Sequence, residues 1–320
     1  MSAPATRNGP ATTAPTWGGP TRFQRFQEYA VLVFLAGCAS ITVLTTAGIV
    51  LVLGVEAFRF FRTSGVSPLA FLSGTEIRPE ADPPQYGILA LIWGTGVIAV
   101  GSSLIALPIG LLSAIYLSEY APRKLRAVLK PTLELLAGIP TIVYGYFALL
   151  IVTPLIRAIL TPLGIHVEAY NALSACIVVG IMIIPMVSSL SEDVLSAVPR
   201  GLREAGYGLG ATKFEVSTRI VLPAGLSGVA AAFILAISRA IGETMAVVLA
   251  AGSRRQITLN PLESIETMTA YIVAVTGGEA AGDSPEYLSL FAVGMALFLM
   301  TLTLNVLSGL ILRRYREAYH

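Results

Sequence analysis

Long apolar runs separated by short polar segments dominate this sequence of 320 residues. Six runs contain at least 22 residues each: Tyr29–Val55, Tyr86–Ser118, Leu135–Ile156, Ala169–Ser191, Ile220–Ser253 and Tyr287–Leu312. An α-helix needs about 20 apolar residues to cross the hydrocarbon of a bilayer, whereas a run of about 10–14 is more typical of a buried helix in a soluble protein. The pattern therefore predicts an all-α polytopic membrane protein with six transmembrane helices.

The composition agrees with this class. Hydrophobic residues make up 55% of the chain and charged residues only 12%, whereas soluble domains carry about 25% charged residues. The net charge of +2 is small and does not indicate a nucleic acid partner. The expected surroundings of the apolar runs are membrane lipid.

Basic residues divide unequally between the two sides of the predicted spans. Fourteen of the 21 lie in the terminal segments and the even-numbered connections, six lie in the odd-numbered connections, and Arg239 lies inside a run. Cytoplasmic connections carry an excess of Lys and Arg, so both termini are predicted to be cytoplasmic. The polar segment 191–223 is then expected on the cytoplasmic side.

The same pattern suggests how the chain is organised. Residues 1–28 begin with a stretch rich in Ala, Thr, Pro and Gly, which is typical of a disordered tail. Transmembrane helix 1 is expected over 29–55 and an external loop over 56–85. Residues 86–320 are expected to form the core, with transmembrane helices 2–6 and a cytoplasmic loop at 191–223.

No catalytic or metal-binding motif is visible. The segment Gly208–Lys213 comes nearest to a phosphate-binding P-loop but lacks its spacing and its Gly-Lys pair. The two cysteines, Cys38 and Cys176, lie in apolar runs and are interpreted as small hydrophobic residues. The chain is therefore predicted to be no enzyme and to bind no cofactor. Energy for transport would come from another subunit or from an ion gradient.

Two charged residues, Arg239 and Glu243, interrupt the fifth run. Each costs about 2.5–3.5 kcal/mol in the middle of a membrane, so both are expected to face the protein interior or an aqueous path. Four residues apart on one predicted helix, they would share a face, and the guanidinium of Arg239 suits a tetrahedral oxyanion. Thr244, Thr141 and Tyr144 are expected to add hydroxyl groups to this path. The alternative is a structural ion pair that fixes helix packing.

The polar segment contains residues with regular spacing. They are Glu204, Ala205, Gly206, Gly210, Ile220, Leu222 and Pro223. This spacing resembles the EAA signature of ABC-importer permeases, E-A-A-x3-G-x9-I-x-L-P, with Gly206 in place of the second Ala. A small residue is kept at that position, although Gly weakens a helix by about 1 kcal/mol relative to Ala.

Further segments resemble the phosphate-specific branch of these permeases. They are Ile92–Thr95, Leu117–Pro122, Leu136–Gly145 and Ser238–Ala246. The stretch Ser67–Pro84 is more similar to the PstC-type subunit than to its PstA-type partner. The resemblance covers most of the chain from the second run onward.

The resemblance implies a type I ABC importer permease fold, a location in the bacterial inner membrane and a set of partners. A second, PstA-like permease subunit, two PstB-like ATPase subunits that use ATP and Mg²⁺, and an external PstS-like phosphate-binding protein would complete the importer. The segment around Glu204 and Gly210 would dock on the ATPase. Arg239 and Glu243 would lie along the translocation path.

Other functions stay open on the residues alone. A secondary anion transporter would also use Arg239 and Glu243, but it would show an inverted repeat, and no convincing repeat relates the two halves. A membrane scaffold or sensor would use the polar segment only for docking. Among importers, a permease for molybdate or sulfate is the alternative.

Overall fold

The computed structural model describes residues 21–278 and 282–314. Within these ranges, six helical segments are long and apolar enough to cross a membrane: Arg22–Ser64, Leu89–Tyr120, Thr141–Leu163, Ala172–Ala197, Lys213–Ile241 and Pro285–Leu310. Every predicted apolar run overlaps one of them. The predicted all-α fold with six transmembrane helices is confirmed, and the described residues add only one two-stranded hairpin.

The first span is α1 (Arg22–Ser64), which starts well before the predicted position at Tyr29. Thr21 and Gln24 cap this start, because the backbone N–H of each donates to the side-chain oxygen of the other. Residues 22–28 are therefore helical, and their assignment to a disordered tail was wrong. The rest of the predicted tail, residues 1–20, lies outside the described residues.

The chain divides into two compact units, Met1–Val52 and Leu53–His320. The helix α1 begins in the first unit and ends in the second. Its residues from Arg22 to Ile49 are all exposed, as expected for a helix whose apolar surface meets lipid.

Aromatic residues organise the connection between the first two spans. It contains α2 (Pro68–Ser73), β1 (Ile77–Arg78) and β2 (Gln85–Tyr86). The strands pair antiparallel, with Ile77 opposite Tyr86. The rings of Phe60, Phe61, Phe71 and Tyr86 lie with centroids 5.2–5.6 Å apart, in a cluster that also contacts α12 (Met268–Gly277) and α13 (Pro285–Arg314). The predicted loop 56–85 is therefore partly helical and packs on the helices.

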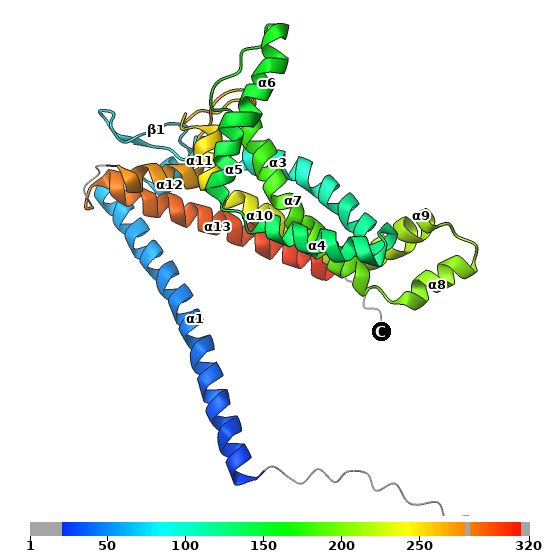
Figure 1. Cartoon of the computed structure of the whole chain (residues 1–320). Helices are drawn as coiled ribbons and strands as arrows, with labels where there is room; N and C mark the ends of the chain where they lie inside the picture. Colours follow the sequence, from blue (N-terminus) through cyan, green and yellow to red (C-terminus); the bar gives the residue numbers. More distant parts are fainter. Residues whose placement is uncertain (1–20, 279–281, 315–320) are drawn as a thin grey trace, which may run out of the picture. The chain divides into compact units, whose positions relative to one another are not determined.

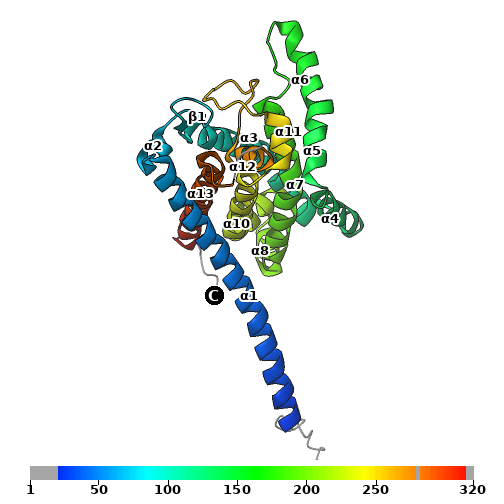
Figure 2. The same cartoon turned by 90° about the vertical axis from the view of Figure 1, so that its left-hand side faces the viewer.

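The centre of the second unit is the pair α3 (Leu89–Ile115) and α7 (Ala172–Ala197), which lie side by side in both views (Figure 1, Figure 2). Glycines allow this approach. A Cβ added at Gly101 would lie 2.5 Å from Sγ of Cys176, and one at Gly110 would lie 2.6 Å from Cγ1 of Val187. Small residues permit close backbone contact between membrane helices.

The other helices extend from this pair. They are η1 (Tyr116–Tyr120), α4 (Arg123–Ala137), α5 (Thr141–Phe147), η2 (Ala148–Val152), α6 (Thr153–Leu160), η3 (Thr161–Leu163), α8 (Arg200–Gly208), α9 (Lys213–Val216), η4 (Ser217–Val221), α10 (Leu222–Ile241) and α11 (Met245–Ala251). Figure 1 shows α8 and α9 at one end of the α3–α7 pair and α6 near the other end.

The fifth apolar run does not form one helix. It was predicted to continue to Ser253, but α10 ends at Ile241 and α11 starts only at Met245. Gly242 closes α10, since its N–H donates to the carbonyls of Ala240 and Ser238. The prediction of one continuous helix was therefore wrong, because the break covers only Gly242, Glu243 and Thr244 and the hydropathy of the long run around it stays high.

Candidate translocation path and coupling element

The polar segment forms a helical hairpin at the end of the α3–α7 pair (Figure 1). Its first residues complete α7, and its middle forms α8. The residues from Lys213 to Pro223 belong to the continuous helix of α9, η4 and α10. Gly210 turns the chain with a φ of +81°, a left-handed conformation that favours glycine. A capping box between Thr212 and Glu215 then starts α9. The predicted loop 191–223 is thus mostly helical.

Gly206 and Ile220 hold this hairpin closed. Gly206 is buried, and a Cβ there would lie 2.6 Å from Cδ1 of Ile220 and 3.0 Å from Cγ2 of Val216. Ile220 and Leu222 pack against the core cluster around Leu195. The glycine at position 206 therefore lets α8 lie closer to η4 than an alanine would.

The other residues of the motif point outward. Glu204, Ala205 and Pro223 are exposed. Next to them, the side chains of Leu209 and Phe214 are 90% and 67% exposed. The sequence motif thus combines residues that close the hairpin with residues that form its outer surface.

Arg239 and Glu243 do not share a helical face. Arg239 lies exposed on the last turn of α10, whereas Glu243 follows the end of that helix and is buried. No ion pair joins them in the described part of the chain. The expectation of a shared face was wrong, because the helix ends between them.

Glu243 instead stabilises the break in the fifth span. Its Oε1 accepts a 3.4 Å hydrogen bond from the backbone N–H of Ala246, at the start of α11. Its backbone carbonyl accepts a 2.8 Å hydrogen bond from the hydroxyl of Thr269 on α12. The hydroxyl of Thr244 donates to the carbonyl of Gly242 at 3.2 Å. Side chains thus hold the non-helical backbone between α10 and α11.

The third span brings Thr141 and Tyr144 to the same region. The helix α5 packs against α11, and a Cβ at Gly145 would lie 2.9 Å from Leu249 and 3.2 Å from the Cα of Ala246. The hydroxyl of Tyr144 donates to the carbonyl of Leu136 at 3.1 Å. Thr141 is half-buried at the first position of α5. Two motifs about a hundred residues apart in the sequence therefore lie side by side.

The sequence reasoning missed one polar contact beside Arg239. The hydroxyl of Ser238 donates to Oδ1 of Asn305, on α13, at 2.8 Å. The feature of the sequence that indicated this contact was Asn305, a side-chain amide within the sixth apolar run. This contact places a second polar group next to Arg239 within the apolar spans.

A second missed contact orders the connection after the fifth span. The carboxylate of Glu266 is buried, accepts a 2.7 Å hydrogen bond from Arg255 and has one oxygen without a partner among the described residues. Burial raises the pKa of Glu266, and Arg255 offsets part of this rise. Arg255 also donates to the carbonyl of Ile77 and lies over the ring of Tyr271.

The chain belongs to the family of binding-protein-dependent transport system inner membrane components, whose model matches residues 106–317. It is 35% identical to the phosphate transport system permease protein PstC of Xylella fastidiosa, over 95% of this chain and 96% of that protein. It is 33% identical to the probable ABC transporter permease protein YqgH of Bacillus subtilis, over 87% of this chain and 88% of that protein.

A solved structure shares the fold. It is a bacterial ABC transporter involved in the import of the acidic polysaccharide alginate, with a TM-score of 0.63 and 14% identity, over 93% of this chain and all of the matched chain. The predicted importer-permease fold and the multi-pass inner-membrane location are thus confirmed. The chain is the membrane component of its transporter and not the ATPase.

Proposed function

We propose that this chain is the permease subunit of an ATP-driven importer that carries inorganic phosphate into the cytoplasm. The observation that carries the proposal is the 35% identity with a PstC protein over nearly the whole of both chains. Both termini would be cytoplasmic, as the distribution of basic residues indicates.

Arg239 is proposed as the residue that meets the anion in the membrane. Its exposed side chain makes no hydrogen bond or ion pair with the described residues, whereas nearby Ser238 and Glu243 are engaged. A guanidinium in a span costs about 2.5–3.5 kcal/mol, which favours a functional reason for its presence. Its planar fork donates two parallel hydrogen bonds to a phosphate.

The groups around Arg239 complete the proposed path. Glu243 holds the break between α10 and α11 and supplies the negative charge nearest in sequence. Thr141, at the start of α5, would offer its hydroxyl to the passing anion, and Thr244 would lie beside the path with its hydroxyl bonded to the carbonyl of Gly242. Tyr144 would contribute its ring, since its hydroxyl is bonded to Leu136. Non-helical backbone at membrane depth is tolerated where it lines a cavity.

The coupling residues would connect the chain to its ATPase. Glu204 and Ala205 would contact the ATPase, while Gly206, Gly210, Ile220, Leu222 and Pro223 would keep the hairpin in shape. The complete importer would contain a second, PstA-like permease subunit, two PstB-like ATPase subunits and an external PstS-like phosphate-binding protein. ATP and Mg²⁺ would be bound by the ATPase.

Phosphate uptake by the complete complex in proteoliposomes tests the proposal. The wild-type complex should import phosphate only with ATP and the binding protein, and Arg239→Ala should lower uptake at least about tenfold, the effect of 1.4 kcal/mol. Arg123→Ala, which removes an exposed arginine at the start of α4, outside the path and the hairpin, is the matched control. Uptake of molybdate or sulfate in preference to phosphate would refute the substrate. ATP-independent uptake would refute the importer class, and full uptake by Arg239→Ala would refute the path.

A further inference from the structure

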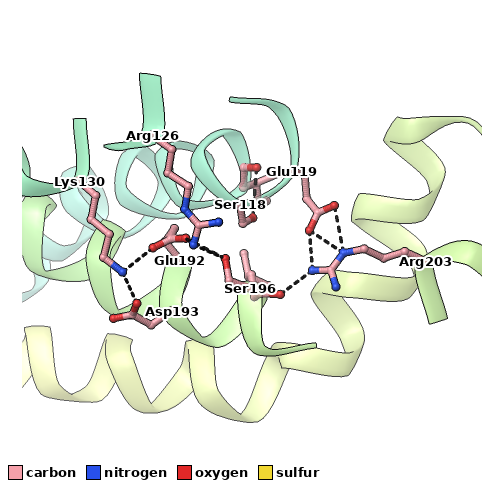
Figure 3. A network of polar contacts seen from close by, with 10 residues as sticks. Ser118, Glu119, Arg126, Lys130, Glu192, Asp193, Ser196 and Arg203 are labelled. Atoms are coloured by element: carbon pink, nitrogen blue, oxygen red, sulfur yellow. Dashed lines mark hydrogen bonds and ion pairs between the residues drawn. The ribbon is translucent and has the colours of Figure 1, made fainter. Parts of the chain in front are cut away.

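Arg203, on α8, joins three parts of the chain through one guanidinium (Figure 3). Its Nη2 and Nε donate to Oε1 of Glu119, on η1, at 2.8 and 3.1 Å. The same group also donates to the carbonyls of Leu195 and Val198, at the end of α7. The planar fork of arginine is suited to this arrangement, because its donors are fixed relative to one another.

This ion pair is shielded from solvent. The side chains of Arg203 and Glu119 are 16% and 5% exposed. Exposed ion pairs contribute little because water screens them, whereas breaking a buried pair leaves a charge without a partner. The contact therefore resists separation of α8 from η1.

Besides Arg203, α8 contacts the spans through Leu202, which is half-buried and packs against the core cluster around Leu195. Gly206 is the only buried residue among its nine, and it contacts η4 rather than η1 or α7. Arg203 is thus the main polar anchor between α8 and the ends of the second and fourth spans. A second contact reinforces the joint, since Nζ of Lys213, at the start of α9, lies 4.8 Å above the ring of Tyr120.

The helix α7, which Arg203 contacts, is itself joined to α4. Glu192, fully buried on α7, accepts from Lys130 at 2.8 Å and pairs with Arg126, both on α4 (Figure 3). Lys130 also pairs with Asp193. Burial lowers the pKa of Lys130, but its bonds to the two carboxylates outweigh this effect and raise the pKa. Ion pairs thus join α4 to α7, and η1 leads directly into α4.

We propose that Arg203 is the positioning residue that passes movement of α8 to the second and fourth spans, with Glu119 as its partner. The inference rests on the proposed docking of an ATPase at the hairpin. When the ATPase displaces α8, η1 and the end of α7 must follow, because separation would leave Glu119 buried and unpaired. The five-residue π-helix η1 provides an irregular segment at this joint, of a kind frequent at functional sites.

The test measures ATP hydrolysed per phosphate imported by the complete complex in proteoliposomes. Arg203→Gln should still assemble with the ATPase, but this ratio should rise about tenfold, within the usual range of coupling between sites. Glu119→Gln should raise it similarly, and the double variant should add little. Arg203→Lys keeps the charge but loses the fork and should give an intermediate ratio. Arg123→Gln, which changes an exposed arginine at the start of α4 and outside the hairpin, should match wild type.

The possible outcomes separate the two hypotheses. An unchanged ratio in assembled Arg203→Gln or Glu119→Gln complexes overturns the inference and leaves phosphate import intact. If the Gln variants fail to assemble, the Arg203→Lys complex tests the inference instead. A wild-type ratio of ATP hydrolysed to phosphate imported in that complex, together with lower thermal stability, would show that Arg203 has only a structural role. Absence of phosphate import by the wild-type complex instead refutes the proposed function. In that case, the role of Arg203 is tested by the ATP hydrolysis that the external binding protein stimulates. Loss of this stimulation in Arg203→Gln supports the role, and retained stimulation overturns it.

Discussion

Two glycines in the hairpin meet different requirements. Gly210 has open space for a side chain but a φ of +81°, so backbone conformation selects glycine there. Gly206 has ordinary helical geometry, but Ile220 and Val216 occupy the place of its Cβ. A substitution at position 206 is therefore a packing change, whereas one at position 210 is a change of backbone strain.

We expect Gly206→Leu to push α8 away from η4 and to lower the amount of ATPase that co-purifies with the chain severalfold. Overpacking costs about 1–3 kcal/mol. Gly206→Ala has a smaller clash, limited mainly to Cδ1 of Ile220. Combining it with Ile220→Val, which removes that atom, should restore wild-type co-purification. Full co-purification of Gly206→Leu would contradict the packing role.

At the scale of helices, the break between α10 and α11 separates Arg239 from Glu243. Gly242 ends one helix, and the carboxylate of Glu243 accepts a hydrogen bond from the first turn of the next. A helix interrupted at membrane depth requires partners for its open backbone groups. Thr269 on α12 supplies one of them. The position of each charge thus follows from elements outside its own run.

The connection after α11 depends on the pair Arg255–Glu266. Burial raises the pKa of Glu266, so the folded state favours its protonated form. Its contribution to stability is therefore present at low pH and is lost as the pH rises through the folded pKa. Arg255 limits this loss by lowering the pKa of the carboxyl.

We therefore expect Arg255→Gln to destabilise the protein more at pH 8 than at pH 5. Removing one partner of a buried pair costs about 3–5 kcal/mol when the other remains charged. Thermal unfolding of the purified chain in detergent at several pH values measures this difference. Adding Glu266→Gln should remove most of the pH dependence. An equal loss of stability at both pH values would contradict the role of Glu266.

At the scale of the whole molecule, the proposed sidedness places the α8–α9 hairpin in the cytoplasm and the connection after α11 outside. Leu209 and Leu259 offer a matched pair of positions, since they are 90% and 88% exposed. We expect Leu209→Cys, in a chain whose Cys38 and Cys176 are replaced, to react with an impermeant thiol reagent only in inverted vesicles. Leu259→Cys should react only in intact cells or right-side-out vesicles. The reverse labelling pattern would overturn the predicted orientation.

The sequence by itself determined the class of this protein. Run length and low charge indicated six spans, because lipid requires long apolar helices, and the spacing from Glu204 to Pro223 resembled that of importer permeases. Only the tertiary structure decided that Arg239 and Glu243 lie on different elements and that Arg203 meets Glu119. These contacts depend on where helices end and which helices pack together. Hydropathy cannot resolve either, since an apolar residue scores alike against lipid and against a neighbouring helix.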